Sequence, residues 1–195
     1  MASLIDSLRP EPAPVIAGGR TFLRPPIIAD WSAWTVLRGE SRHFLGPWEP
    51  TWPADDLTRP AFRRRLRRYA RDARDDSGYA FLVFLKDGGN LVGGITVSGV
   101  RRGVTQSASI GYWMGERFAG RGLMTDAVRA ILPWLFDTMR LHRVEAACLP
   151  TNGPSKALLR RVGFTEEGYA REYLKIDGAW ADHLLFGMLA GDPRT

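Results

Sequence analysis

The chain has 195 residues, of which 45% are hydrophobic and 25% are charged, and this composition is typical of a soluble globular domain rather than a disordered or coiled-coil protein. The single cysteine excludes an intramolecular disulfide, the three histidines lack paired metal-ligand spacing, and no apolar run is long enough to cross a membrane. The net charge of +6 suits an anionic ligand and equally a protein that contacts RNA. We therefore expect a cytoplasmic, metal-free protein without a membrane or secretory segment.

Nothing in the chain indicates two domains. We find no internal repeat and no low-complexity linker. Residues 1–19 are predicted to be an N-terminal extension, in which Pro10, Pro12 and Pro14 favour a short extended lead-in. Residues 20–190 are predicted to form a single domain, a length that supports a substantial core.

The domain is expected to begin with a strand. Polar and apolar residues alternate over residues 20–24, and two prolines end the run. Asp30 follows in a position to cap a helix that runs through residues 31–37. Residues 44–50 hold two prolines and a glycine, which is too much for either regular element, so we expect a loop there.

Residues 57–76 are predicted to form an amphipathic helix. Their apolar side chains fall at helical spacing on one stripe, made of Phe62, Leu66, Tyr69, Ala70 and Ala73. The other face is basic and carries Arg63, Arg64, Arg65, Arg67, Arg68, Arg71 and Arg74. This face has two interpretations: the solvated surface that most amphipathic helices show, or a contact with nucleic acid or the ribosome.

The rest of the chain alternates strands and helices. Strands are predicted over residues 79–86, 91–100, 107–114, 143–149, 166–175 and 180–189, with turns at 87–90 and 177–178. Helices are predicted over residues 122–139 and 155–162, and Pro133 is expected to kink the first or to replace one backbone bond. Strands joined through a crossover helix imply a mixed α/β sheet.

A glycine-rich turn over residues 117–125, between a strand and a helix, is the first candidate site. Gly120 and Gly122 let the backbone approach a ligand and turn its N–H groups toward one place. The positive end of the following helix and the side chains of Arg117 and Arg121 complete an arrangement suited to a pyrophosphate. On its own, a Gly-Arg-Gly sequence is more often only a tight turn.

A second motif follows the next strand, with Asn152, Ser155, Leu158 and Gly163-Phe164 at the spacing Asn-x-x-Ser-x-x-Leu-x-x-x-x-Gly-Phe. Together the two motifs resemble those of the GNAT acyltransferases, whose coenzyme A loop reads Arg/Gln-x-x-Gly-x-Gly/Ala. The resemblance implies an α/β (α+β) domain whose mixed, mostly antiparallel sheet has splayed central strands and flanking helices. It also implies acetyl-CoA as co-substrate and no metal.

The same resemblance assigns ligand contacts. The splayed strands would be residues 107–114 and 143–149, and the pantetheine arm would lie between them like an extra strand. Backbone groups near Trp113 and Met114 are expected to meet the pantetheine amides and the thioester oxygen, while Ser155 is expected close to the sulfur. The residues expected to bind acetyl-CoA are Trp113, Met114, Arg117, Gly120, Arg121, Gly122, Met124, Thr125, Asn152, Ser155 and Leu158.

Longer stretches resemble one branch of this family, the bacterial Rim-type enzymes that acetylate the N-terminal alanine or serine of ribosomal proteins. These stretches are residues 44–50, 109–113, 160–168 and 176–183, within a resemblance that spans residues 20–189. They imply an acetyl-CoA-dependent N-acetyltransferase acting on the N-terminal α-amine of a protein or peptide, such as a ribosomal protein. Similar enzymes also acetylate free amino acids and drugs, so the acceptor stays open.

The catalytic groups are less clearly indicated. Ser155 either donates a proton to the departing thiolate or only N-caps the helix that it begins. The strand before the coenzyme loop lacks the glutamate that many GNAT enzymes carry, so the candidate bases are Glu49, Glu145 and Glu172. Trp48 and Glu49 are candidates to hold a cationic amine, unless Trp48 plugs the core.

The pKa of the acceptor amine favours an N-terminal α-amine over a lysine side chain. An α-amine with a pKa of about 7.7–8.0 is partly neutral near neutral pH, whereas a lysine with a pKa of about 10.4 almost never is. An enzyme without a dedicated base therefore suits N-terminal amines. Two rivals remain: an acetyltransferase for a small amine such as an amino acid or drug, and a non-catalytic module that binds CoA or RNA. The sequence leaves direct nucleic-acid contact open, and also the choice between monomer and dimer.

Overall fold

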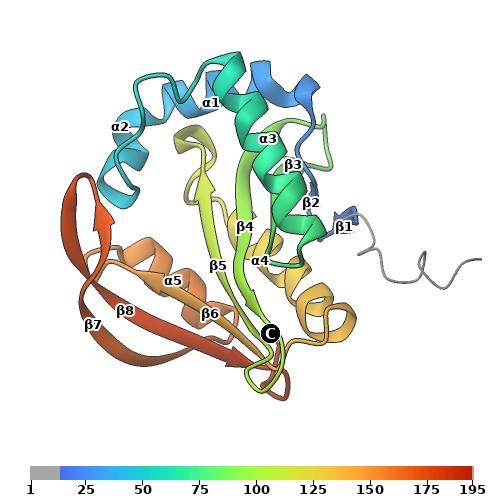
Figure 1. The fold of residues 1–195 in the computed structure, drawn as a ribbon, viewed down its shortest axis with the longest axis vertical. Helices are drawn as coiled ribbons and strands as arrows, with labels where there is room; N and C mark the ends of the chain where they lie inside the picture. The colour runs from blue at the N-terminus through green and yellow to red at the C-terminus, as the bar shows by residue number, and fades with distance from the viewer. Residues whose placement is uncertain (1–13, 195) are drawn as a thin grey trace, which may run out of the picture.

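The computed structural model describes residues 14–194 and forms one sheet with helices on both faces (Figure 1). Its strands are β1 (Ile16–Ala17), β2 (Thr21–Arg24), β3 (Gly78–Leu85), β4 (Leu91–Arg101), β5 (Ser107–Met114), β6 (Arg143–Cys148), β7 (Thr165–Ile176) and β8 (Ala179–Leu189). Its α-helices are α1 (Trp31–Glu40), α2 (Arg42–Leu45), α3 (Arg59–Arg74), α4 (Leu123–Pro133) and α5 (Gly153–Arg161). Short helical segments are η2 (Ile28–Asp30), η3 (Gly46–Trp48), η4 (Glu116–Phe118) and the π-helical η5 (Trp134–Thr138). Of the predicted N-terminal extension, residues 1–13 lie outside the described part, whereas β1 pairs with β2 in the sheet.

The strands follow the order β1-β2-β3-β4-β5-β6-β8-β7 in one sheet. Neighbouring strands are antiparallel except β5 and β6, which run parallel because α4 carries the chain back between them. The predicted mixed, mostly antiparallel sheet with flanking helices is therefore confirmed.

Strand β3 is buried on both faces, which explains its nearly continuous apolar sequence. Phe81 and Val83 pack into the large core together with the inner side chains of α4. Leu82 and Phe84 point to the opposite face, where they pack with residues of α1 and α3. The helices α1 and α3 thus form a layer on one face of the sheet, and α4 covers the other.

Strands β5 and β6 separate toward one end of the sheet. They pair only over residues 107–109 and 143–145, although β5 continues to Met114 and β6 to Cys148. Beyond this point β5 keeps its partner β4 and β6 keeps its partner β8, so the two central strands diverge (Figure 1). The predicted splay is confirmed, and it leaves one side of β5 without a neighbouring strand.

Local structure departs from the prediction at two places. Asp30 precedes α1, but its carboxylate accepts hydrogen bonds from Arg24 and from the N–H of Ile27 instead of capping the helix.

Residues 44–50 are mostly helical rather than a loop, because Pro47 stands in the first turn of η3, where proline is tolerated. Pro133 ends the regular bonding of α4 as expected, and the helix continues as η5.

Candidate active site

The glycine-rich turn joins β5 to α4 through η4. Gly120 and Gly122 adopt left-handed φ angles of 72° and 73°, which a residue with a Cβ adopts only at a cost. No atom lies within 4 Å of the position that a Cβ would occupy at either glycine, so the turn presents an open surface of backbone. Gly122 begins α4 without a side-chain cap, which leaves the first N–H groups of the helix without a capping acceptor. A helix end of this kind is suited to a phosphate group.

Two arginines flank Phe118 in this turn. The guanidinium carbons of Arg117 and Arg121 lie 5.0 and 5.9 Å from the centroid of its ring. Arg117 also pairs with Glu40 at 3.1 Å, but both side chains are more than half exposed, so the pair is weak. Arg121 is exposed and forms no ion pair with any residue from 14 to 194. Both guanidinium groups are therefore accessible to an anion.

The turn is held in place by Asp126 of α4. Its carboxylate accepts hydrogen bonds of 2.7–3.0 Å from the N–H groups of Gly19, Arg20 and Thr21 and from the Thr21 hydroxyl. Burial raises the pKa of Asp126, but these bonds outweigh that effect and hold the pKa below its ordinary value. Arg20 adds a bond of 3.0 Å to the carbonyl of Arg121. The segment between β1 and β2 thus fixes the glycine-rich turn.

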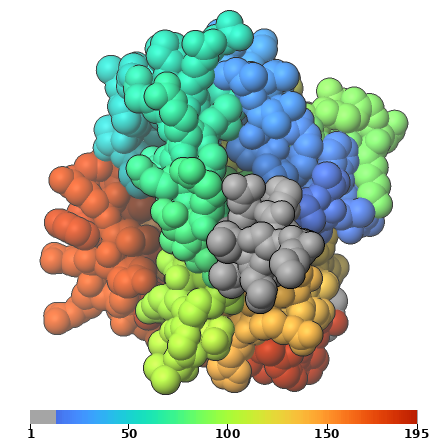
Figure 2. Space-filling view, turned by 45° about the vertical axis from the view of Figure 1, so that its right-hand side comes forward, coloured from blue at the N-terminus to red at the C-terminus, as the bar shows by residue number. Residues whose placement is uncertain are grey.

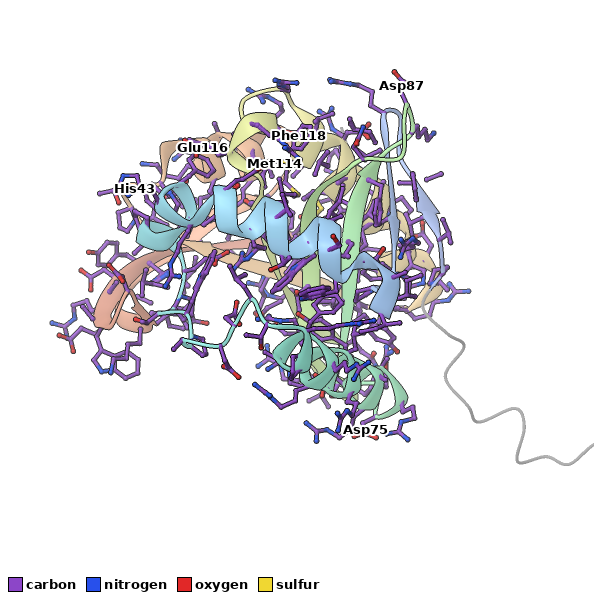
Figure 3. The ribbon with its side chains drawn as sticks, turned by 90° about the horizontal axis from the view of Figure 1, so that it is seen from above. His43, Asp75, Asp87, Met114, Glu116 and Phe118 are labelled. Atoms are coloured by element: carbon purple, nitrogen blue, oxygen red, sulfur yellow. The ribbon has the colours of Figure 1, made fainter. Side chains whose placement is uncertain are left out.

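Strand β5 presents main-chain groups beside this turn. Gly115 donates its N–H to the carbonyl of Val92 at 2.8 Å, and successive N–H groups of a strand point to opposite sides. The N–H groups of Tyr112 and Met114 therefore point away from β4, toward β6, which pairs with neither residue. Figure 3 shows Met114 close to Glu116, where the chain leaves β5 for η4. An extended ligand between β5 and β6 would meet these groups.

Several predicted coenzyme contacts have side chains that face the interior. Met124 and Thr125 are each only 6% exposed, and Leu158 is half-buried against the same core. The Trp113 indole lies across Gly94 of β4, since a Cβ there would be 2.5 Å from its nitrogen. At the start of α4, a ligand can therefore reach the backbone N–H groups but not the side chains of Met124 and Thr125.

Ser155 meets Tyr112 between α5 and β5. Their hydroxyl oxygens are 2.7 Å apart. Burial raises the pKa of the Tyr112 phenol well above its ordinary range, so the phenol stays protonated. The cap of α5 is Asn152, whose side-chain oxygen accepts the N–H of Ser155 at 3.1 Å. The alternative that Ser155 caps this helix is therefore wrong, and its hydroxyl is directed to Tyr112.

Cys148 ends β6 within reach of the same serine. Burial raises the pKa of the Cys148 thiol, and a hydrogen bond with Ser155 only partly opposes this effect. A thiol that stays protonated is a poor nucleophile. Cys148 is therefore poorly suited to carry an acyl-cysteine intermediate.

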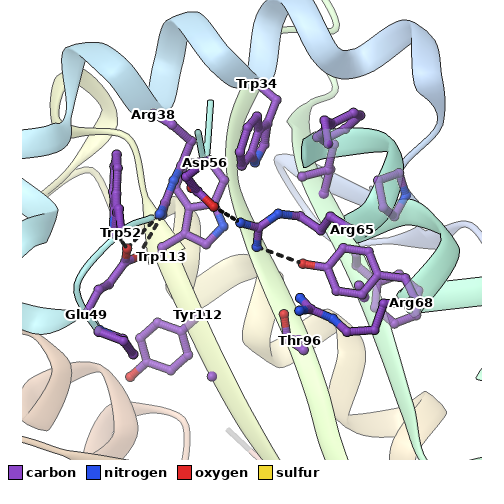
Figure 4. Close-up of a pocket in the computed structure, with 18 of the residues that line it drawn as sticks. Trp34, Arg38, Glu49, Trp52, Asp56, Arg65, Arg68, Thr96, Tyr112 and Trp113 are labelled. Atoms are coloured by element: carbon purple, nitrogen blue, oxygen red, sulfur yellow. Dashed lines mark hydrogen bonds and ion pairs between the residues drawn. The ribbon is translucent and has the colours of Figure 1, made fainter. Parts of the chain in front are cut away.

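A cavity of about 550 Å³, here called the α3 cavity, lies on the α1 and α3 face of the sheet (Figure 4). Its floor is formed by β3, β4 and β5 and includes Thr96, Gly111 and Tyr112. Its walls come from α1, from α3 and from residues 49–53. Because Tyr112 lines the cavity and also contacts Ser155, the cavity reaches the place where β5 and β6 diverge.

Arg38 occupies the aromatic wall of the α3 cavity. Its guanidinium carbon lies 4.0 Å from the ring centroid of Trp52 and 4.9 Å from that of Trp113. It donates two hydrogen bonds of 2.7 Å to Glu49, which accepts a third from the Trp52 indole. Trp48 is half-buried in η3, outside both core clusters and outside the cavity lining. Trp52 rather than Trp48 therefore forms the wall, and both oxygens of Glu49 are engaged.

Helix α3 brings a second ion pair to the cavity. Arg65 donates a hydrogen bond of 2.5 Å to Asp56 and one of 3.5 Å to the hydroxyl of Tyr69. Arg68 lies on the same wall and stacks over Tyr69 at 5.3 Å. Sequence analysis placed both arginines on a surface face and missed Asp56, because a helical pattern does not reveal what the polar side of the helix covers.

The family described as "Acetyltransferase (GNAT) domain" matches residues 20–165 of the chain. The matched part contains the glycine-rich turn, both diverging strands and Ser155. The chain belongs to the GNAT acetyltransferase family. It is therefore an enzyme of the N-acetyltransferase class, as the motifs predicted.

Individual relatives match this GNAT enzyme over most of their length. The chain is 32% identical over 178 residues to the probable N-acetyltransferase YjcK of Bacillus subtilis, which covers 91% of this chain and 98% of the relative. It is 34% identical over 168 residues to the ribosomal protein uS5-alanine N-acetyltransferase of Escherichia coli, and the match covers 85% of this chain and 87% of the relative. Its fold matches that of Mycobacterium smegmatis RimJ in complex with CoA-disulfide, with a TM-score of 0.87 and 35% identity. This match covers 93% of this chain and 90% of the RimJ chain.

The structure does not bring every predicted base of this GNAT enzyme to the cavity. Glu145 on β6 pairs with two arginines at 2.9 and 3.0 Å. Glu172 is exposed on β7, at an irregularity in the pairing with β8 and with a left-handed φ of 47°. Neither residue lines the α3 cavity, whereas the two acidic residues that do, Glu49 and Asp56, are each paired with an arginine.

Two further features of residues 14–194 bear on the class of protein. No group of histidine, cysteine, aspartate and glutamate side chains in this range could hold a metal ion. No helix in the same range is long and apolar enough to cross a membrane.

Proposed function

We propose that this chain transfers the acetyl group of acetyl-CoA to the N-terminal α-amine of a protein that begins with alanine or serine, such as a ribosomal protein. A relative named for such a reaction matches over most of both chains. The observation that carries the proposal is that both acids of the α3 cavity, Glu49 and Asp56, are neutralised by arginines. Without a free carboxylate to act as base, the α-amine is the acceptor that needs least help, because its pKa is about 7.7–8.0 against about 10.4 for lysine.

Acetyl-CoA has a suitable place between the glycine-rich turn and the diverging strands. The uncapped N–H groups of α4, with Arg117 and Arg121, would hold the pyrophosphate. The main-chain groups of Tyr112 and the carbonyl of Met114 would bond the pantetheine amides, which leaves the N–H of Met114 for the thioester oxygen. Asn152 can contact the same arm through its amide NH2 group, because capping uses only the side-chain oxygen.

The reaction is a direct acyl transfer. The neutral amine attacks the thioester carbonyl carbon, the new C–N bond forms, the C–S bond breaks, and the amine gives its proton to water while the thiolate receives one. The N–H of Met114 is the donor for the oxyanion, a contribution of about 2.7–4 kcal/mol in comparable sites. Ser155 gives its proton to the departing sulfur and takes one back from the solvent, which has received the proton of the amine. Its oxygen lies 2.7 Å from that of Tyr112, and with the phenol as the donor in this pair the serine hydrogen stays available for the sulfur.

The α3 cavity receives the acceptor in this proposal. Space above the cavity floor is open at Gly111, where no atom lies within 4 Å of the missing Cβ. A volume of about 550 Å³ accepts either the first residues of a peptide or a compact small amine. Size therefore does not separate these two acceptors. The lack of an unpaired acid supports an amine of low pKa, such as the N-terminus of a peptide.

An acceptor panel tests the proposal. The purified full chain is given acetyl-CoA and one acceptor at a time, and release of the free thiol is followed. The panel holds peptides that begin with alanine or serine, the same peptides with a blocked N-terminus and an internal lysine, free amino acids and an aminoglycoside. We expect turnover with the unblocked peptides alone. Turnover only with free amino acids or the aminoglycoside would establish a small-amine acetyltransferase, and acetyl-CoA binding without any turnover would establish a non-catalytic module.

A further inference from the structure

Helix α3 carries a basic face that the acetyl transfer does not use. Its 16 residues include eight arginines and only one aspartate. Phe62 and Leu66 pack toward the sheet, and Arg65 and Arg68 line the α3 cavity. The other side, here called the α3 stripe, consists of the exposed residues Arg63, Arg64, Arg67, Arg71 and Arg74. The helix stands out as a ridge on the molecular surface in Figure 2.

The protein neutralises little of this charge. Two members of the α3 stripe pair with neighbouring aspartates, one of them only at 3.9 Å. Arg63, Arg67 and Arg74 have no acidic partner within the described part of the chain. All five members of the stripe are exposed, so the stripe faces solvent. Figure 3 shows Asp75, the residue that ends α3, at the outer edge of the molecule in that view. Its charge is available to a partner.

Repulsion among the arginines of the α3 stripe destabilises the helix that carries them. Like charges three or four residues apart on a helix destabilise it by about 0.2–0.5 kcal/mol for each pair. Arg67 forms such pairs with Arg63 and with Arg71, and Arg71 forms another with Arg74. A helix face that only has to be soluble does not need charges of one sign, because a mixture of acidic and basic side chains is solvated equally well. A run of one sign over about 16 Å of helix therefore favours an extended anionic partner.

We propose that the α3 stripe binds the phosphate backbone of RNA. Guanidinium groups match phosphate oxygens with paired hydrogen bonds, and nucleic-acid interfaces are polar and strongly positive. An acidic protein is a poorer match, because protein interfaces combine arginine with buried aromatic anchors and are depleted of charge at their centre, whereas the stripe offers only exposed arginines. An anionic membrane surface would also attract these charges, but a helix that inserts in the interface buries its apolar side there, and the apolar side of α3 is already packed on the sheet.

RNA bound in this way would lie next to the acceptor. The same helix lines the α3 cavity through Arg65 and Arg68, so its two sides connect the stripe to the cavity. An N-terminus presented by an RNA-bound protein would enter the cavity while the RNA contacts the stripe. The RNA contact is independent of the acceptor's identity, and it can fail without affecting acetyl transfer to a free peptide.

The test compares two variants with equal loss of charge. Arg63→Gln/Arg67→Gln/Arg74→Gln removes the unpaired arginines of the stripe and keeps good helix-forming residues. The matched control Lys86→Gln/Arg171→Gln/Lys175→Gln removes three exposed positive charges elsewhere. Binding of a fluorescein-labelled RNA hairpin to the full chain is measured by anisotropy between about 50 and 200 mM salt.

The stripe variant should bind the hairpin more weakly than the wild type. The slope of log K against log salt should become less steep by about two to three, because each lost phosphate contact removes about 0.7–0.9 from the slope. The control should keep the wild-type slope, and both variants should acetylate a free peptide at the wild-type rate. An unchanged slope in the stripe variant, or an equal change in the control, would overturn the proposal. Binding of polyglutamate without binding of RNA would overturn it in favour of an acidic protein partner.

Discussion

Replacing Tyr112 by phenylalanine tests whether this phenol acts through Ser155. The change removes one oxygen and keeps the half-buried ring, so the packing is preserved. The lost hydrogen bond joins two neutral hydroxyls at 2.7 Å, and such a bond contributes about 0.5–1.5 kcal/mol. Because about 1.4 kcal/mol corresponds to a factor of ten in rate, kcat should fall about two- to tenfold.

The dependence on Ser155 is the sharper part of this prediction. Ser155→Ala removes the proton donor itself and should lower kcat by about 10²-fold. If Tyr112 only positions Ser155, adding Tyr112→Phe to Ser155→Ala should cause no further loss. Since Asn152 rather than Ser155 caps α5, the melting temperature of Ser155→Ala should stay close to that of the wild type.

The assay is steady-state thiol release at saturating acetyl-CoA and peptide, at a pH above about 8, where the acceptor amine is mostly neutral. Tyr169→Phe is the matched control, because this exposed tyrosine on β7 also loses a hydrogen bond, to Asp182, away from the site. Its kcat should not change. Losses that multiply in the double variant, or an unchanged kcat in Tyr112→Phe, would refute the role given to this pair.

Three further substitutions test the coenzyme turn, its support and the cavity wall. Gly120→Asp should abolish acetyl-CoA binding in calorimetry, because it places a carboxylate where the pyrophosphate must approach. Asp126→Asn should lower the free energy of unfolding by about 1–2 kcal/mol near neutral pH, because the carboxylate accepts four hydrogen bonds. Arg38→Gln should lower the free energy of unfolding by about 3 kcal/mol or more, because the substitution leaves the partly buried Glu49 carboxylate without its cation. The same substitution should raise the KM for the peptide but not the KM for acetyl-CoA.

Each of these substitutions has a distinguishing control. Gly120→Asn tolerates the same left-handed φ without a charge, so equal loss of binding in both variants would assign the effect to strain. The lowered pKa of Asp126 stabilises the fold above the ordinary carboxyl pKa, and this contribution is lost as pH falls through the lowered value. The difference between wild type and Asp126→Asn should therefore shrink from about pH 5 downward. An Arg38→Gln protein with wild-type stability would show that the Glu49 pair is dispensable.

The elements of the fold were predictable wherever local pattern dominates. The alternation of residues 20–24, the apolar run of β3 and the glycine-rich turn all depend on neighbours in sequence, and each appears where it was expected. The loop predicted over residues 44–50 was wrong because the rule counted prolines without regard to position. Pro47 lies in the first turn of η3, where its missing N–H has no partner to lose.

The contacts that complete the site were not predictable, because they join residues far apart in the chain. Asp126 holds the turn through residues more than 100 positions earlier. Glu49 was identified as a candidate for the site, but the cation beside it is the protein's own Arg38 rather than a substrate. The Ser155 motif was visible in the sequence, whereas its partner Tyr112 becomes visible only when β5 is placed beside α5.

Competition between two amines of one peptide is the most direct measurement of the proposed activity. The full chain and acetyl-CoA are incubated with a peptide that begins with alanine and contains one internal lysine, and tandem mass spectrometry locates the acetyl group. The acetyl group should appear on the α-amine alone, at a rate that rises with pH through about 7–8 as that amine loses its proton. Acetylation of the lysine side chain, or none at either amine, would contradict the assignment of this enzyme to protein N-termini.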